Sequence, residues 1–137
     1  MFDYTVDTKQ SVAQAIETLT RHLKEDSFGV LWNLDMKATL EGKGFEYDHD
    51  YHVLEVCNPE AAKKVLTQNQ LAGYILPCKI AVYEDGSTTK IGMPKPTELI
   101  NLVGDRALLA FASDFEKRLK SCIKASANVD TRMNEDE

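Results

Sequence analysis

Two cysteines, each close to a proline, are the residues of this sequence best placed to do chemistry. Cys57 begins the segment Cys-Asn-Pro, and Cys78 ends the segment Leu-Pro-Cys. Two thiols can form a redox pair, hold a soft metal ion or act as a nucleophile with a helper, provided that one reaches the thiolate form. Cys57 directly precedes a predicted helix start, whose backbone amides could lower its pKa. The competing interpretation is burial, because Cys78 alternates with the apolar Ile80 and Val82.

The direction of the strands that carry these cysteines decides whether their sulfur atoms can meet. Residues 51–57 and 76–83 both have β character, and a helical segment capped by Asn58 joins them. If the two strands are antiparallel neighbours, both cysteines lie at one end of the sheet; a parallel crossover would separate them by a strand length. The sequence leaves both arrangements open. The candidate ligand or redox site is therefore Cys57, Asn58 and Cys78.

A second group of possible ligands consists of Asp48, His49, Asp50 and His52. Alternate side chains of an extended segment point to opposite sides, so only Asp48, Asp50 and His52 can face together. Two carboxylates and one imidazole without cysteine spacing are a weak metal pattern, and a solvated loop is the preferred interpretation. The sequence also lacks a glycine-rich phosphate loop, a serine in a nucleophile turn and zinc-finger spacing. We therefore predict no metal, no cofactor and no catalytic residues.

Hydrophobic periodicity predicts the elements of the N-terminal part. Residues 2–6 alternate between apolar and polar side chains, which is typical of a half-buried strand. Ser11 and Gln14 have the spacing of a capping box, and an amphipathic helix follows them. Every second residue from 28 to 36 is apolar, so this strand is predicted to direct that row, including Trp32, into the core.

An Asp-Gly pair at residues 85–86 determines the direction of two strands. Asp-Gly favours tight hairpins, so residues 88–93 are predicted to return antiparallel to residues 76–83. Strands and helices then follow one another in the order β-α-β-β-α-β-β-α. This order predicts an α+β fold, in which helices cover one face of a largely antiparallel sheet of about five strands.

The C-terminal part is predicted to be helical and then disordered. Short and long helices are expected at residues 97–103 and 106–124, and Cys122 lies on the apolar stripe of the second as a core thiol. Residues 126–137 are acidic and have no periodicity. We therefore expect a single α+β domain over residues 1–125 and a disordered acidic tail over residues 126–137.

Composition argues against several classes of partner. The chain has 16 Lys and Arg against 22 Asp and Glu, and its net charge of −6 repels nucleic-acid phosphates and anionic lipids. Three cysteines are an odd number, and the first residues lack the basic and apolar segments of a secretion signal. The apolar runs are far shorter than the roughly 20 residues of a membrane-spanning helix. We expect a soluble cytoplasmic protein that binds neither nucleic acid nor membrane.

Several segments resemble the domain-of-unknown-function family number 302. They are Phe28-Gly29-Val30-Leu31, Cys57-Asn58-Pro59, Gly73, Leu76-Pro77-Cys78 and Val82-Tyr83-Glu84. The resemblance extends roughly over residues 4–112, although Ser27 stands where the family usually has glycine. It implies a small α+β domain of the TATA-binding-protein-like fold group, commonly paired as a homodimer, with no assigned biochemical activity.

Two functions are the leading hypotheses, and metal binding through His52 with Asp48 and Asp50 is a third. The first is a non-enzymatic, dimeric ligand-binding or interaction module, with a pocket for a small molecule near Asn58 and Cys78. The second is a thiol-based redox or sulfur-handling protein, in which Cys57 reacts and Cys78 resolves. The sequence favours the first, because it contains no recognisable catalytic constellation.

Overall fold

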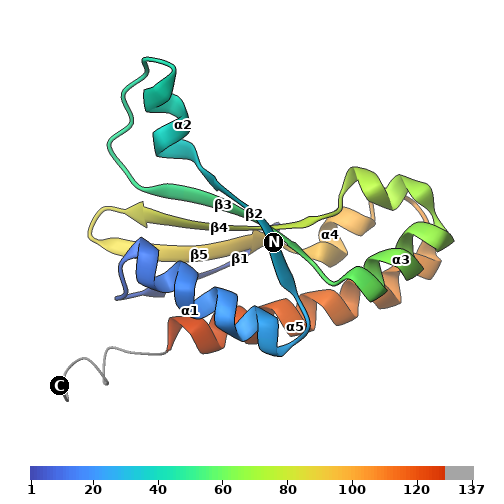
Figure 1. The fold of residues 1–137 in the computed structure, drawn as a ribbon. Coiled ribbons are helices and arrows are strands. Elements are labelled where there is room, and N and C mark those ends of the chain that lie inside the picture. The colour runs from blue at the N-terminus through green and yellow to red at the C-terminus, as the bar shows by residue number, and fades with distance from the viewer. Residues whose placement is uncertain (129–137) are drawn as a thin grey trace.

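Five strands form one antiparallel sheet in the order β1-β5-β4-β3-β2 (Figure 1). The computed structural model describes residues 1–128. The strands are β1 Asp3–Thr8, β2 Gly29–Asp35, β3 Tyr51–Cys57, β4 Cys78–Asp85 and β5 Thr88–Pro94. The antiparallel β4–β5 hairpin turns at Gly86, which has a φ of 64°. The predicted antiparallel sheet and its hairpin are thus confirmed.

Two long helices pack side by side on one face of this sheet (Figure 1). The helices are α1 Val12–Glu25, α2 Met36–Gly42, α3 Pro59–Gln68, α4 Pro96–Ile100 and α5 Leu109–Ala127, with short 3-10 segments η1 Gln70–Tyr74 and η2 Arg106–Leu108. It is α1 and α5 that cover the sheet. The predicted order of strands and long helices is confirmed, and the short elements α2, η1, α4 and η2 are inserted between them.

Local signals explain where the helices begin. The N–H of Gln14 donates to Ser11 Oγ at 3.2 Å, and the N–H of Ser11 donates to Gln14 Oε1 at 3.1 Å. This reciprocal pair is the predicted capping box of α1. At the start of α3, Asn58 Oδ1 accepts a hydrogen bond from the N–H of Ala61 at 3.2 Å, and Pro59 is the first helical residue.

The core lies between the sheet and the pair α1 and α5. Alternate residues of the central strands point into it, as the sequence pattern predicts. The fully buried residues from both layers include Leu19, Leu23, Leu54, Val56, Ile80, Val82, Ile91, Leu119 and Ile123. Cys122 is also buried on α5, which confirms its prediction as a core thiol.

Strand β2 differs from its prediction because it contains a β-bulge. Val30 pairs with Val56, but the next pair is Trp32 with Glu55, so Leu31 between them has no partner. One extra residue reverses the alternation of the side chains beyond it. Val30 therefore faces the core, whereas Trp32 lies on the opposite face of the sheet with 54% of its surface exposed. The prediction that Trp32 packs in the core is wrong.

Helix α5 continues slightly further than the predicted end of the domain. Ser126 is fully buried, and its hydroxyl donates to the carbonyl of Cys122 at 2.7 Å. The tail prediction otherwise falls on residues 129–137, which lie outside the described residues. No helix within residues 1–128 has both the length and the apolar character needed to cross a lipid bilayer.

Candidate ligand-binding site

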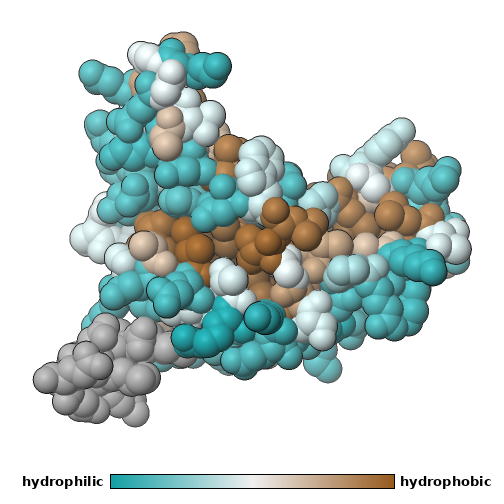
Figure 2. Space-filling view, in the orientation of Figure 1, coloured by the Kyte–Doolittle hydropathy of each residue, from teal (hydrophilic) through white to brown (hydrophobic). Residues whose placement is uncertain are grey.

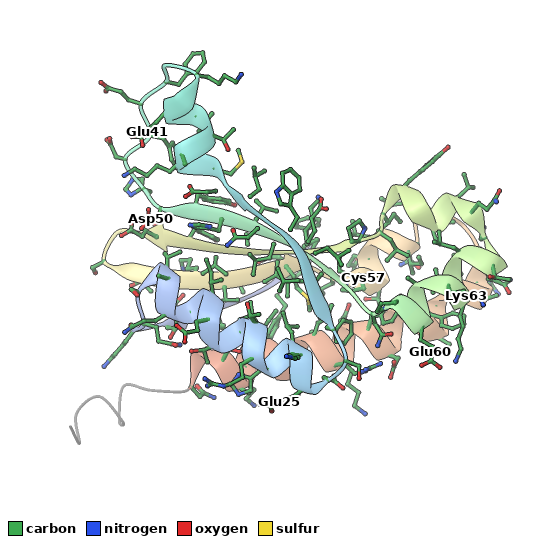
Figure 3. All side chains as sticks on the ribbon, in the orientation of Figure 1. Glu25, Glu41, Asp50, Cys57, Glu60 and Lys63 are labelled. Carbon is green, nitrogen blue, oxygen red and sulfur yellow. The ribbon has the colours of Figure 1, made fainter. Side chains whose placement is uncertain are left out.

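The two proline-flanked cysteines lie at the same end of the sheet. Strands β3 and β4 are antiparallel neighbours, and Val56 is directly opposite Cys78. Figure 3 shows Cys57 where β3 leaves the sheet and α3 begins. Of the two arrangements that the sequence leaves open, the structure has the antiparallel one, so Cys57 and Cys78 are close neighbours at this end.

Burial makes both thiols harder to ionise. The N–H of Ala61 is bonded to the Asn58 side chain, and the N–H of Ala62 donates to the Asn58 carbonyl at 2.9 Å. These amides are therefore not free to stabilise a thiolate at Cys57, whose pKa is raised by burial. Burial, with a smaller contribution from Cys57, raises the pKa of Cys78 to about 11. The expectation that the start of α3 lowers the pKa of Cys57 is not met.

A cavity of about 420 Å³ opens beside Cys78, between the end of the sheet and the C-terminal helices. Its buried wall is apolar and consists of Val65, Met93, Pro96, Ile100, Leu108, Ala112 and Phe115. Lys79 also borders the cavity, and it is the only charged residue among the described residues that line it. The cavity thus has an almost entirely apolar lining with a single basic residue at its border.

Large apolar side chains at the rim of this cavity are left in water. Phe2 is 65% exposed, Tyr74 is 87% exposed and Leu102 is 81% exposed. Figure 2 shows apolar residues gathered over the middle of the molecule and continuing towards the end that carries α3 and α4. Exposed apolar patches of this kind commonly mark binding surfaces.

Prolines and one carboxylate hold the walls of the cavity in place. Pro94 ends β5 and Pro96 begins α4, so the chain turns away from the sheet at the cavity. The N–H and hydroxyl of Thr97 then donate to Glu116 Oε1 at 3.2 and 2.6 Å, which ties α4 to α5. The backbone N–H of Lys95 donates to the carbonyl of Phe2 at 2.8 Å and fixes the N-terminal wall.

Only one of the three predicted site residues lines this cavity. Cys78 belongs to its wall, whereas Cys57 and Asn58 line a second hollow of about 10 Å³, which Cys78 also borders. A space of that size holds about one water molecule at most. The Asn58 side chain is engaged as the cap of α3. The main cavity is therefore displaced from the Cys-Asn-Pro segment towards α4 and α5.

The rim residues were missed by the sequence-based prediction. Phe2, Tyr74 and Leu102 are far apart in the chain. Phe2 begins the predicted alternation of residues 2–6, whereas Tyr74 and Leu102 lie outside the strands. An apolar residue outside a strand pattern was the signal available for Tyr74 and Leu102. Three such residues meet at one rim only because the sheet brings the N-terminus, η1 and the segment after α4 together.

The acidic loop with its histidines lies away from this site. Asp50 and Cys57 are at opposite ends of β3 in Figure 3. His52 Nδ1 lies 2.7 Å from Asn33 Oδ1, and the N–H of Asp50 donates to Glu84 Oε1 at 2.7 Å. Within residues 1–128, no cluster of three or more His, Cys, Asp and Glu side chains could hold a metal ion.

These features define a small α+β domain, with two helices covering one face of an antiparallel sheet and an apolar cavity at one end. The chain belongs to the family described as Domain of unknown function DUF302, which matches residues 4–126. It is similar to the crystal structure of an uncharacterized conserved DUF302 protein from Bacillus stearothermophilus. The two are 46% identical, with 93% of this chain and 99% of that chain covered and a TM-score of 0.89. None of the curated proteins matches this chain.

Membership of this family confirms the resemblance found in the sequence, and the family description assigns no activity.

Proposed function

We propose that this protein is a homodimeric ligand-binding module, which holds an apolar small molecule in the cavity beside Cys78. The observation that carries the proposal is the apolar cavity of about 420 Å³ with its exposed apolar rim. Small-molecule sites typically measure about 300–1,000 Å³ and are lined mostly by hydrophobic side chains. A bound apolar molecule would remove both the wall and the rim from water, which is favourable by about 25 cal/mol per Å² of apolar surface.

The chemistry of the cavity favours binding over thiol catalysis. A thiol with a pKa of about 11, as at Cys78, is almost entirely protonated at neutral pH. In that form it behaves as a small, polarisable apolar group. One observation favours the thiol-based alternative, namely that Cys57 and Cys78 lie at the same end of the sheet. The raised pKa of both thiols argues against it, and ligand binding is the function that we retain.

Binding of the neutral dye Nile red tests the cavity. We expect its fluorescence to rise with the native protein and the Leu102→Asp variant to bind about tenfold more weakly, because a carboxylate at the rim opposes apolar burial. Leu102 is exposed, so the variant should keep its fold. Leu109→Asp is the matched control, since Leu109 is also exposed but does not line the cavity. Absence of dye binding to the folded native protein would contradict the proposal. An equal loss of dye affinity in the two variants would contradict it as well.

The open face of the sheet supports the homodimer. No helix of the described residues covers the face opposite α1 and α5 (Figure 1). Half-buried Leu34, Val53 and Ala81 lie on that face, and the rings of Tyr51 and Tyr83 stack there with centroids 4.8 Å apart. An antiparallel sheet with one solvated face normally directs polar residues to the water. This apolar centre is therefore better explained by a covering partner.

The charges on the open face favour a second copy of the chain as that partner. Lys79 Nζ lies 3.0 Å from Glu55 Oε1, and Lys90 Nζ lies 2.8 Å from Asp7 Oδ1. Each of these two lysines thus has a carboxylate beside it. A two-fold dimer places the same surface against itself, so each lysine can also meet a carboxylate of the second copy. Exposed Trp32 adds an aromatic side chain of the kind enriched in interfaces.

A further inference from the structure

We propose that the ligand of the apolar cavity is a monocarboxylic acid with an apolar body, whose carboxylate binds the ammonium group of Lys79. This inference rests on the proposed function of the cavity and names the chemical class that the cavity selects. It is carried by the position of one basic residue at the border of an otherwise apolar site.

Lys79 lies where the cavity meets the open face of the sheet. It is the second residue of β4 and pairs with Glu55 of β3, whose side chain points to the open face. Lys79 is one of the residues that border the cavity, and its side chain is 56% exposed. Long basic side chains commonly lay their methylene groups along apolar surface and keep the charge in water. From this border position the flexible side chain can bring its ammonium group to the mouth of the cavity.

The ammonium group has room for another acceptor. It carries three N–H donors, and among the described residues its hydrogen-bond partner is Glu55 Oε1 at 3.0 Å. A ligand carboxylate can accept from a second donor without displacing Glu55. A dianion such as a phosphate would face stronger repulsion from the Glu55 carboxylate, and a ligand amine would be repelled by Lys79 itself. A single carboxylate is the head group that satisfies both conditions.

The walls require the remainder of the ligand to be apolar. Within residues 1–128 no buried side-chain nitrogen or oxygen lacks a hydrogen-bond partner, so the cavity holds no unsatisfied polar side chain awaiting a ligand. A polar group deep in the cavity would lose its hydrogen bonds to water without replacement. The volume of about 420 Å³ lies within the roughly 300–1,000 Å³ of small-molecule sites. An alkyl chain or a small aryl group fits these limits.

A comparison of decanoate with decanol separates the contribution of the carboxylate to the binding affinity from that of the alkyl chain. Both have the same chain, and both can be measured by displacement of Nile red below their aggregation limits. We expect the native protein to bind decanoate about threefold to tenfold more tightly than decanol, the range of a partly exposed charged hydrogen bond. In Lys79→Met the two affinities should become equal, with decanol unchanged. In Glu55→Gln decanoate should bind more tightly, because a competing carboxylate is removed.

Lys90→Met is the matched control, because Lys90 is paired with Asp7 on the same face but does not line the cavity. It should keep the preference for decanoate. Equal affinities for acid and alcohol in the native protein, or a preference that survives in Lys79→Met, would overturn the carboxylate assignment and leave the apolar cavity intact. If neither compound displaces the dye, the proposed function of the cavity fails as well.

Discussion

Ser27 has an unusual backbone conformation at the end of α1. Its φ is 65°, in the left-handed region that side chains disfavour. The N–H of Phe28 donates to the carbonyl of Leu23 at 2.9 Å, and the N–H of Ser27 donates to that of Lys24 at 3.1 Å. These two bonds form a Schellman motif, whose left-handed residue is usually glycine. The serine therefore carries a conformational cost that glycine would avoid.

Replacement of Ser27 by glycine should therefore stabilise the protein. We expect Ser27→Gly to raise the free energy of unfolding by about 0.5–1 kcal/mol, since the left-handed conformation costs an L-residue about 1–2 kcal/mol and glycine loses more chain entropy on folding. Urea unfolding measures the change. Ser113→Gly on the exposed side of α5 is the control and should lower stability by about 0.5 kcal/mol. A destabilised Ser27→Gly variant would contradict the assigned conformation.

At the scale of elements, one carboxylate joins α4 to α5 and thereby shapes the cavity wall. The Glu116 side chain is 15% exposed, accepts two hydrogen bonds from Thr97 and lies 3.3 Å from Lys120 Nζ. Burial acts to raise the pKa of Glu116, but the hydrogen bonds from Thr97 and the charge of Lys120 outweigh it and leave the pKa below its ordinary value. The ionised form is thus the one that holds α4.

This contact should depend on pH. Because the folded protein lowers the pKa of Glu116, its stabilisation is complete above the ordinary carboxyl pKa of about 4.3 and is lost as the pH falls through the lowered value. Glu116→Gln should be less stable than the native protein by about 1 kcal/mol at neutral pH, and the difference should shrink below about pH 4. Urea unfolding at several pH values tests this. Glu17→Gln, on the exposed side of α1, serves as the control. If the difference in unfolding free energy between Glu116→Gln and the native protein did not change with pH, the mechanism would be excluded.

At the scale of the whole molecule, Lys79 lies on the open face and borders the cavity, and we propose a different partner for each of these two surfaces. Helix α2 and the loop after it stand on the open side of the sheet (Figure 1). Val53, in the central part of β3, lies on this face opposite Ala81, some distance along the strand from the cavity end. A partner across the face and a ligand in the cavity should therefore be separable by mutation.

Substitution at Val53 should abolish self-association and spare ligand binding. We expect Val53→Asp to be monomeric in equilibrium sedimentation, because two copies of the new charge would face an apolar interface. Nile red binding should stay within about twofold of the native value, since distant sites act independently. Ala13→Asp on the exposed side of α1 is the matched control and should remain dimeric. A monomeric native protein at all concentrations would contradict the dimer and leave the cavity proposal standing.

Local chemistry determined much of this protein directly from its sequence. The capping box at Ser11, the Asn58 cap, the Asp-Gly hairpin and the alternation in β4 depend on residues a few positions apart, so their patterns can be read without the fold. The buried Cys122 followed from helical periodicity for the same reason. These features fixed the fold class and identified the end of the sheet near which Cys78 lies.

Only the tertiary structure decided the features that join distant segments. The bulge at Leu31 reversed the face of Trp32, because an unpaired residue becomes visible only when its neighbours are aligned with β3. The cavity depends on the strand order, which brings Phe2, Tyr74 and Leu102 to one rim. Strand order and cavity shape arise from packing between residues far apart in the chain, and no local pattern records which of them will meet.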